Sequence, residues 1–80
     1  MDHLRIMQEL ADIISGRNPA WTGDAAANAE TFLHRIRYDA PDDASLLAYD
    51  LLQNIKDFST ETGLSPDRIK WAANLLMLEV

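Results

Sequence analysis

The sequence predicts an all-α fold, a compact bundle of four short helices at residues 2–15, 24–38, 43–60 and 66–79. Apolar side chains recur at three- and four-residue steps in each range, which is the period of a helix with one buried face. No segment alternates apolar and polar residues as a half-buried strand does. All three glycines fall between the ranges, and the 80 residues are expected to form one domain, 1–80.

The first predicted helix, 2–15, carries an apolar stripe and is followed by an irregular connector. Asp2 is a suitable N-cap, and Gly16 can take the left-handed conformation that ends a helix. Pro19 prevents a simple continuation, and we expect Trp21 to fold back onto the core. Its stripe consists of Leu4, Met7, Leu10, Ala11 and Ile14, widened by Ile6 and Ile13.

The second predicted helix, 24–38, begins at Asp24 or Thr22 as the N-cap and ends before Pro41, because proline disfavours helix at the residue before it. The third, 43–60, begins near Asp42 and Asp43, either of which can accept from the free N–H groups of the first turn. Its predicted buried stripe is Leu47, Leu51, Ile55 and Phe58, broadened by Ala48, Leu52 and Leu46.

The last predicted helix, 66–79, has a well-defined start, with Ser65 as the N-cap and Pro66 in the first position. Apolar residues lie on most of its faces, which is typical of a central helix or of one that packs on two partners. The first helix is also broad. We therefore expect either burial at the centre of the fold or apolar surface that a homodimer or a second protein would cover.

The net charge of the protein favours some classes of partner over others. Seven Lys and Arg against thirteen Asp and Glu give a formal net charge of −6. This field repels nucleic-acid backbones and anionic membranes and favours encounter with basic protein surfaces. No apolar run is long enough to cross a bilayer, and the beginning of the sequence does not resemble a signal peptide, so we expect a cytoplasmic protein.

The segment from Ile55 to Leu76 resembles a helix-turn-helix, with Gly63 at the turn. The resemblance implies a DNA-binding regulator that presents Ser65, Arg68 and Lys70 to the major groove. The scarcity of basic residues argues against it, because phosphate contacts need several Lys or Arg. We keep it as the alternative hypothesis.

Two further patterns favour structural interpretations. The stretch DDASLL resembles the modified serine site of acyl carrier proteins, but Ala44 separates Asp43 from Ser45, so we interpret Ser45 as a first-turn residue. His3 and His34 lie far apart and lack metal-ligand spacing. The chain has no cysteine, nucleophile elbow or phosphate-binding glycine loop, so we expect no metal, no cofactor and no enzymatic activity.

The leading hypothesis is therefore a small acidic module that binds another protein with a basic surface, as an inhibitor, antagonist or adaptor. A phage-type anti-defence protein, similar in kind to anti-CRISPR proteins, that covers a nucleic-acid-binding surface is one example of this class. Aromatic and apolar side chains would anchor such a contact, and acids would flank it. The candidate residues are Trp21, Tyr38, Tyr49, Trp71, Met77, Asp42 and Asp43.

Overall fold

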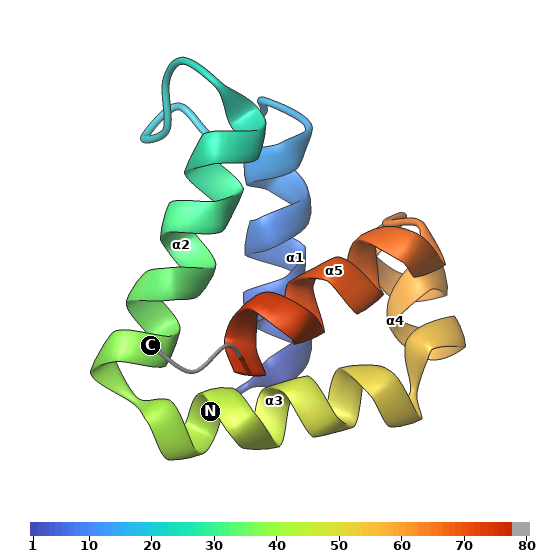
Figure 1. Cartoon of the computed structure of the whole chain (residues 1–80). Coiled ribbons are helices and arrows are strands. Elements are labelled where there is room, and N and C mark those ends of the chain that lie inside the picture. Colours follow the sequence, from blue (N-terminus) through green and yellow to red (C-terminus); the bar gives the residue numbers. More distant parts are fainter. Residues whose placement is uncertain (78–80) are drawn as a thin grey trace.

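The computed structural model describes residues 1–77, which form five helices and no strand. In chain order the helices are α1 (His3–Ile14), α2 (Ala25–Asp39), α3 (Pro41–Gln53), α4 (Ile55–Thr62) and α5 (Pro66–Met77) (Figure 1). The all-α class is confirmed, and the predicted number of four helices is wrong. The predicted helix end at Glu79 and the inward position of Val80 lie outside the described residues.

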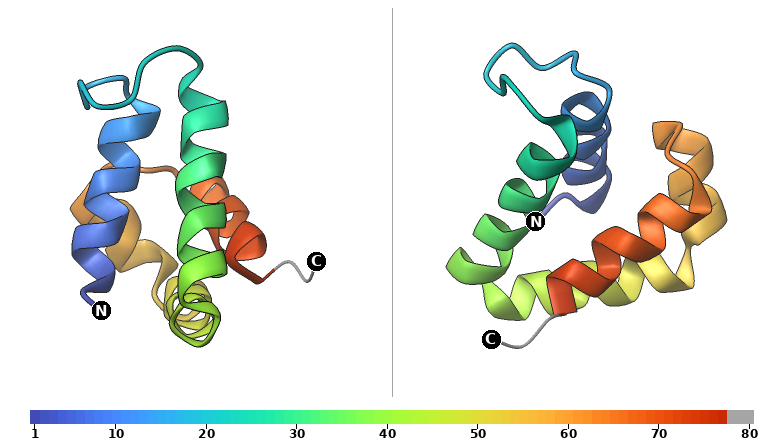
Figure 2. Two further views of the ribbon diagram at one scale, coloured as in Figure 1. Left: turned by 90° about the vertical axis from the view of Figure 1, so that its left-hand side faces the viewer. Right: turned by 45° about the horizontal axis from the view of Figure 1, so that its top comes forward.

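The helices pack around α5. Helices α1 and α2 lie side by side and antiparallel, α3 crosses below them, and α4 turns back against α1 (Figures 1 and 2). Helix α5 packs on α2, α3 and α4. Within residues 1–77, no helix combines the length and the apolar character that crossing a bilayer requires.

Three helices begin at side-chain caps that the sequence predicts. The acceptors are Asp2 for α1, Asp24 for α2 and Ser65 for α5, each bonded to a backbone N–H of the first turn at 2.9–3.3 Å. Gly63 ends α4 with a φ of 78°, a left-handed conformation that glycine adopts without steric cost. The structure therefore confirms the predicted caps at these three helix starts and the predicted glycine at the end of α4.

The predicted third helix, 43–60, is two helices, because the chain bends at Asn54. Asn54 has non-helical angles (φ −131°, ψ 38°). Its side-chain amide donates to the carbonyl oxygen of Asp50 at 3.2 Å and to the Asp50 carboxylate at 2.7 Å. Asparagine competes with the helical backbone in this way, and here its amide is a second donor to the Asp50 carbonyl, which also accepts from the backbone N–H of Asn54. The bend directs α4 onto α1.

The corner between α2 and α3 also differs from the prediction. Ala40 ends α2 and is also the residue before α3, and Pro41 is the first residue of α3 rather than a spacer between helices. No side chain caps α3, so the expectation that Asp42 or Asp43 would do so is wrong. Both aspartates lie in the first turn instead, where a negative charge complements the positive end of the helix dipole.

One hydrophobic core joins all five helices. It contains the buried side chains Met7, Leu10, Ala11, Ile13, Ala29, Leu33, Ala44, Leu47, Ala48, Leu51, Phe58, Leu64, Ile69, Ala72, Ala73 and Leu76. The breadth of apolar residues in α5 follows from its central place, since Ile69, Ala72, Ala73 and Leu76 are buried and Leu75 packs against the core. The core therefore takes up most of the apolar side chains of α5.

Candidate protein-binding surface

Large apolar side chains are exposed on α3. Leu46 is 62% exposed, Tyr49 is 64% exposed and Leu52 is 39% exposed. Their neighbours Leu47 and Leu51 are fully buried. The expectation that Leu46 and Leu52 broaden the buried stripe is therefore wrong, and only Ala48 does so.

The exposure follows from the helical period. The buried residues of α3 are Ala44, Leu47, Ala48 and Leu51, which lie on one face at three- and four-residue steps. Asp42, Leu46 and Tyr49 follow the same steps on the opposite face, and Asp43 and Leu52 lie at its two opposite edges. We call the exposed residues Asp42, Asp43, Leu46, Tyr49 and Leu52 the α3 surface.

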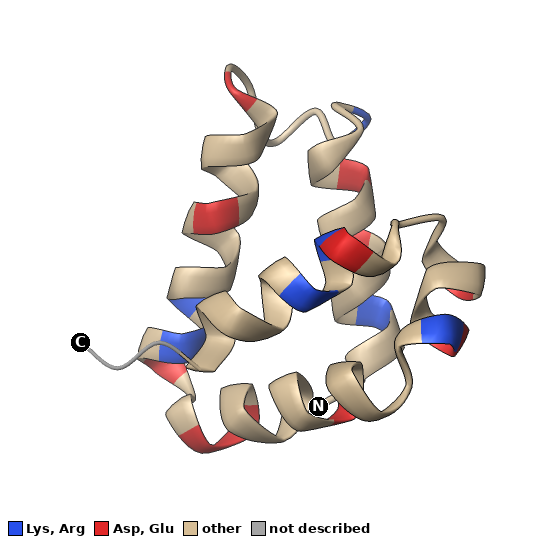
Figure 3. Ribbon diagram, turned by 45° about the vertical axis from the view of Figure 1, so that its right-hand side comes forward, with Lys and Arg blue, Asp and Glu red and all other residues tan. Residues whose placement is uncertain are grey.

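The α3 surface is negatively charged. Helix α3 contains three aspartates and no Lys or Arg. In the part of the chain that the structure describes, the carboxylates of Asp42 and Asp43 take part in no ion pair or side-chain hydrogen bond. Figure 3 shows acidic positions along α3 and at the α2–α3 corner. The exposed apolar side chains are thus accompanied by two carboxylates that have no side-chain partner among the described residues and that lie at the positive end of the α3 dipole.

Two further candidate residues are exposed near one end of α3. Tyr38, in the last turn of α2, is 87% exposed, and Met77, the last residue of α5, is 44% exposed. Helix α5 ends close to the α2–α3 corner in both views (Figures 1 and 2). Five of the seven predicted anchors and acids therefore lie on α3 or close to this corner.

The two tryptophans lie elsewhere and are half-buried. Trp21 packs edge-on against Phe32, with ring centroids 6.3 Å apart, and the Arg35 guanidinium lies 5.5 Å from the Trp21 ring. The guanidinium of Arg68 lies 4.8 Å from the ring of Trp71. Intramolecular contacts thus occupy part of both rings.

The residues of the helix-turn-helix alternative lie at the start of α5. The Ser65 hydroxyl accepts from the backbone N–H of Arg68, and the Arg68 side chain stacks on Trp71. Lys70 is exposed. Helices α4 and α5 together contain Lys56, Arg68 and Lys70 but also Asp57, Glu61 and Asp67, so their formal charges cancel.

A hollow lies between α1 and the bend from α3 to α4, and none of the predictions from the sequence includes it. It has a volume of about 250 Å³ and is lined by Leu4, Asp50, Asn54, Asp57, Phe58 and Glu61. We call it the α4 hollow. Two of its residues, Asp57 and Glu61, are four positions apart, which places two like charges on one helix face with no basic residue four positions away. No set of three or more His, Asp or Glu side chains among residues 1–77 is arranged to hold a metal ion.

Neither a family model, nor a curated protein, nor a solved structure matches the chain. The residues of the α3 surface and their geometry therefore carry the functional argument.

Proposed function

We propose that this protein acts by binding a basic surface of another protein through the α3 surface. The observation that supports the proposal is the exposure of Leu46, Tyr49 and Leu52 beside Asp42 and Asp43 on a helix that contains no basic residue. Apolar and aromatic side chains supply binding energy at a desolvated centre. Acids at the rim steer a basic partner toward it and repel an acidic one.

Because the proposed partner has a basic surface, we propose that the protein is an inhibitor or antagonist. An adaptor would use the same binding surface without blocking the partner. Basic protein surfaces commonly bind the backbones of nucleic acids, and the affinity of this binding depends on contacts with the phosphates. An acidic protein that covers such a surface prevents these contacts, as a phage-type anti-defence protein does. The net charge of −6 supplies the long-range attraction that such competition needs.

Charge argues against a second copy of this chain as the occupant. A two-fold dimer through the α3 surface places the same patch on both sides of the interface. Asp42 and Asp43 of each chain would then approach a surface with no basic residue to pair them. Like charges brought together across an interface disfavour association. Light scattering should therefore give the mass of one chain, and a stable dimer lost on Leu46→Ser would assign the surface to self-association.

The test is competitive capture from a lysate of the native host. The immobilised wild-type protein is compared with Leu46→Ser/Tyr49→Ser, in which two exposed side chains become small and polar. We expect a basic protein that the wild type retains and the variant does not. Added nucleic acid should release it from the wild type, because both ligands would use the same basic surface.

The control variant is Gln8→Ser/Thr31→Ser, which changes two exposed positions on α1 and α2. It should capture as the wild type does, and circular dichroism should show equal helix content in all three proteins. Equal capture by the α3 variant would refute the role of the α3 surface. If added nucleic acid does not release the captured protein, the α3 surface does not cover a nucleic-acid-binding surface. The adaptor function would then be the remaining form of the proposal.

The alternative is the DNA-binding regulator. It is favoured by one observation: α4 and α5 pack together across a left-handed Gly63, and Arg68 and Lys70 follow on α5. Binding to duplex DNA over a series of salt concentrations separates the two functions. An affinity that falls steeply with salt and is lost in Arg68→Ala/Lys70→Ala would establish the regulator. The protein-binding proposal expects no such affinity.

A further inference from the structure

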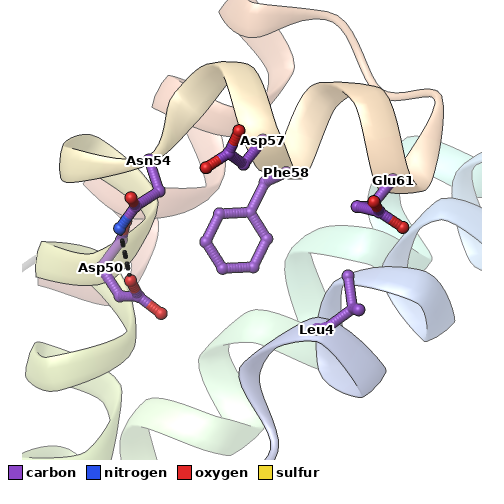
Figure 4. Close-up of a pocket in the computed structure, with 6 residues that line it drawn as sticks. All are labelled: Leu4, Asp50, Asn54, Asp57, Phe58 and Glu61. Carbon is purple, nitrogen blue, oxygen red and sulfur yellow. Dashed lines mark hydrogen bonds between the residues drawn. The ribbon is translucent and has the colours of Figure 1, made fainter.

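The α4 hollow combines an apolar floor with a charged rim. Phe58 is buried and presents its ring to the hollow, and Leu4 of α1 lies opposite it (Figure 4). In this view the carboxylate of Asp57 lies above the Phe58 ring and that of Glu61 lies to the right of the ring. The volume of about 250 Å³ is smaller than the roughly 300–1,000 Å³ of small-molecule sites. It therefore suits a single long side chain better than a whole small molecule.

The three carboxylates of the hollow differ in their partners. One oxygen of Asp50 accepts from the Asn54 amide at 2.7 Å, and the other lies 2.7 Å from Nδ1 of His3. Asp57 and Glu61 have no side-chain hydrogen bond or ion pair with another described residue. They are four residues apart on α4, a spacing at which like charges destabilise a helix. A cation placed between them would remove this repulsion.

The hollow continues the α3 surface. Asp42, Leu46 and Asp50 are spaced by four residues, so they form one row along α3, and the row ends at the bend where the hollow opens. A partner that lies along α3 would therefore reach the hollow with the next part of its chain. Its apolar part would face Leu46 and Tyr49, and a basic residue would follow.

We propose that the α4 hollow binds one arginine side chain of the basic protein partner. Its aliphatic stem would pack on Leu4, its guanidinium would lie against the Phe58 ring, and its N–H groups would donate to Asp57 and Glu61. Arginine fits better than lysine because the planar guanidinium stacks on aromatic rings and donates in several directions at once. The inference rests on the proposed function for the identity of the partner, but the pocket can be tested without that partner.

The experiment is an NMR titration of the ¹⁵N-labelled protein with N-acetyl-arginine amide, which imitates an arginine within a chain. We expect the largest shift changes at the amides of Asp57, Phe58 and Glu61. The lysine analogue should bind more weakly, and the citrulline analogue, which has the same shape without the charge, should not bind measurably. Asp57→Asn/Glu61→Gln should lower the affinity for the arginine probe by at least about tenfold.

The matched control is Glu30→Gln/Asp39→Asn, which removes the same two charges from exposed positions on α2, a helix that contributes no residue to the hollow or to the α3 surface. It should leave the affinity for the arginine probe within about twofold, because exposed charges beyond a Debye length are screened at ordinary salt. Phe58→Leu keeps an apolar floor without a ring, and should weaken arginine binding more than lysine binding.

Several results would contradict the proposal that the α4 hollow binds an arginine side chain. They are an equal loss in the Glu30/Asp39 control, equal binding of citrulline, equal binding of lysine, or no binding of the arginine probe. Tighter binding of free L-arginine than of the blocked amide would assign the hollow to a small molecule instead. Because the titration contains no partner protein, its failure is distinct from a failure of capture through Leu46 and Tyr49.

Discussion

Helices α3 and α5 resemble each other in sequence, since both carry apolar residues on more than one face. Their surroundings differ. Helix α5 packs on α2, α3 and α4, and these neighbours and the core take up most of its apolar side chains. Helix α3 also packs on α2, α4 and α5, but it forms one edge of the bundle (Figure 2). Its outward face exposes Leu46, Tyr49 and Leu52.

The difference shows that the apolar breadth of a helix does not by itself locate a binding surface. A helix that is broadly apolar and central is explained by the core alone. A helix that is broadly apolar and peripheral leaves apolar side chains in contact with water, which is unfavourable. A partner that covers these side chains removes that contact. The position of a helix in the fold therefore decides the meaning of its sequence, and mutations on the two helices can test this directly.

The largest expected effect is the difference in unfolding free energy between substitutions on the two faces of α3. Leu47→Ala should lower the free energy of unfolding by about 2–5 kcal/mol, because it leaves a cavity among fully buried side chains. Leu46→Ala, one residue earlier, should change it by less than about 0.5 kcal/mol. Urea denaturation of both variants checks the contrast. Equal losses would place Leu46 in the core and remove the α3 surface.

The next effect tests whether α5 is as closely packed as its central position implies. Ala73→Leu adds volume where the side chain is fully buried, and should cost about 1–3 kcal/mol of unfolding free energy. Asn74→Leu, at the exposed neighbouring position, should be neutral or slightly stabilising, because leucine favours helix more than asparagine does. Thermal and urea unfolding measure both. A neutral Ala73→Leu would show unfilled space beside α5.

A smaller effect concerns the end of α3. Asn54→Ala removes the amide that bonds to Asp50 and should cost about 0.5–1.5 kcal/mol of unfolding free energy. Gln53→Ala is the control, because Gln53 is exposed and the structure shows no side-chain bond for it. Urea unfolding compares the two. No loss in Asn54→Ala would mean that packing of α4 on α1, rather than the asparagine, causes the bend.

The bend at Asn54 separates the features of this fold that the sequence predicts from those that it does not. The class of fold, the caps Asp2, Asp24 and Ser65 and the stop at Gly63 depend on local chemistry, and the structure confirms them. The apolar period runs unbroken through Leu51, Ile55 and Phe58, so it conceals the break at Asn54. Tertiary packing of α4 on α1 is not encoded in that period.

The candidate surface was predictable only in part. Residue type and position predict Tyr38, Tyr49, Asp42 and Asp43 as contact residues, and the structure exposes all four near or along α3. The helical period predicts Leu46 and Leu52 in a widened buried stripe, whereas the structure exposes both. The α4 hollow requires α1 to lie beside Phe58, a contact between residues more than 50 positions apart that no local pattern contains.

The smallest expected effect compares the starts of α3 and α5. Helix α5 has a bonded cap at Ser65 and one acid, Asp67, in its first turn, whereas α3 has no bonded cap and depends on Asp42 and Asp43. Each aspartate near a helix start contributes about 0.3–1 kcal/mol at low ionic strength. Asp42→Asn/Asp43→Asn should therefore lower the free energy of unfolding more than Asp67→Asn does.

Two electrostatic terms oppose each other in that comparison. Neutralising any acid also relieves repulsion within a chain of net charge −6. The dipole term acts within the first turn, while the repulsion is spread over the whole molecule, so we expect the dipole term to dominate for Asp42 and Asp43. Repeating the urea titrations at about 1 M salt, where the Debye length is about 3 Å, should reduce both losses. A gain in stability from Asp42→Asn/Asp43→Asn at low salt would mean that these acids destabilise the folded chain, and would strengthen the case that a basic partner compensates them.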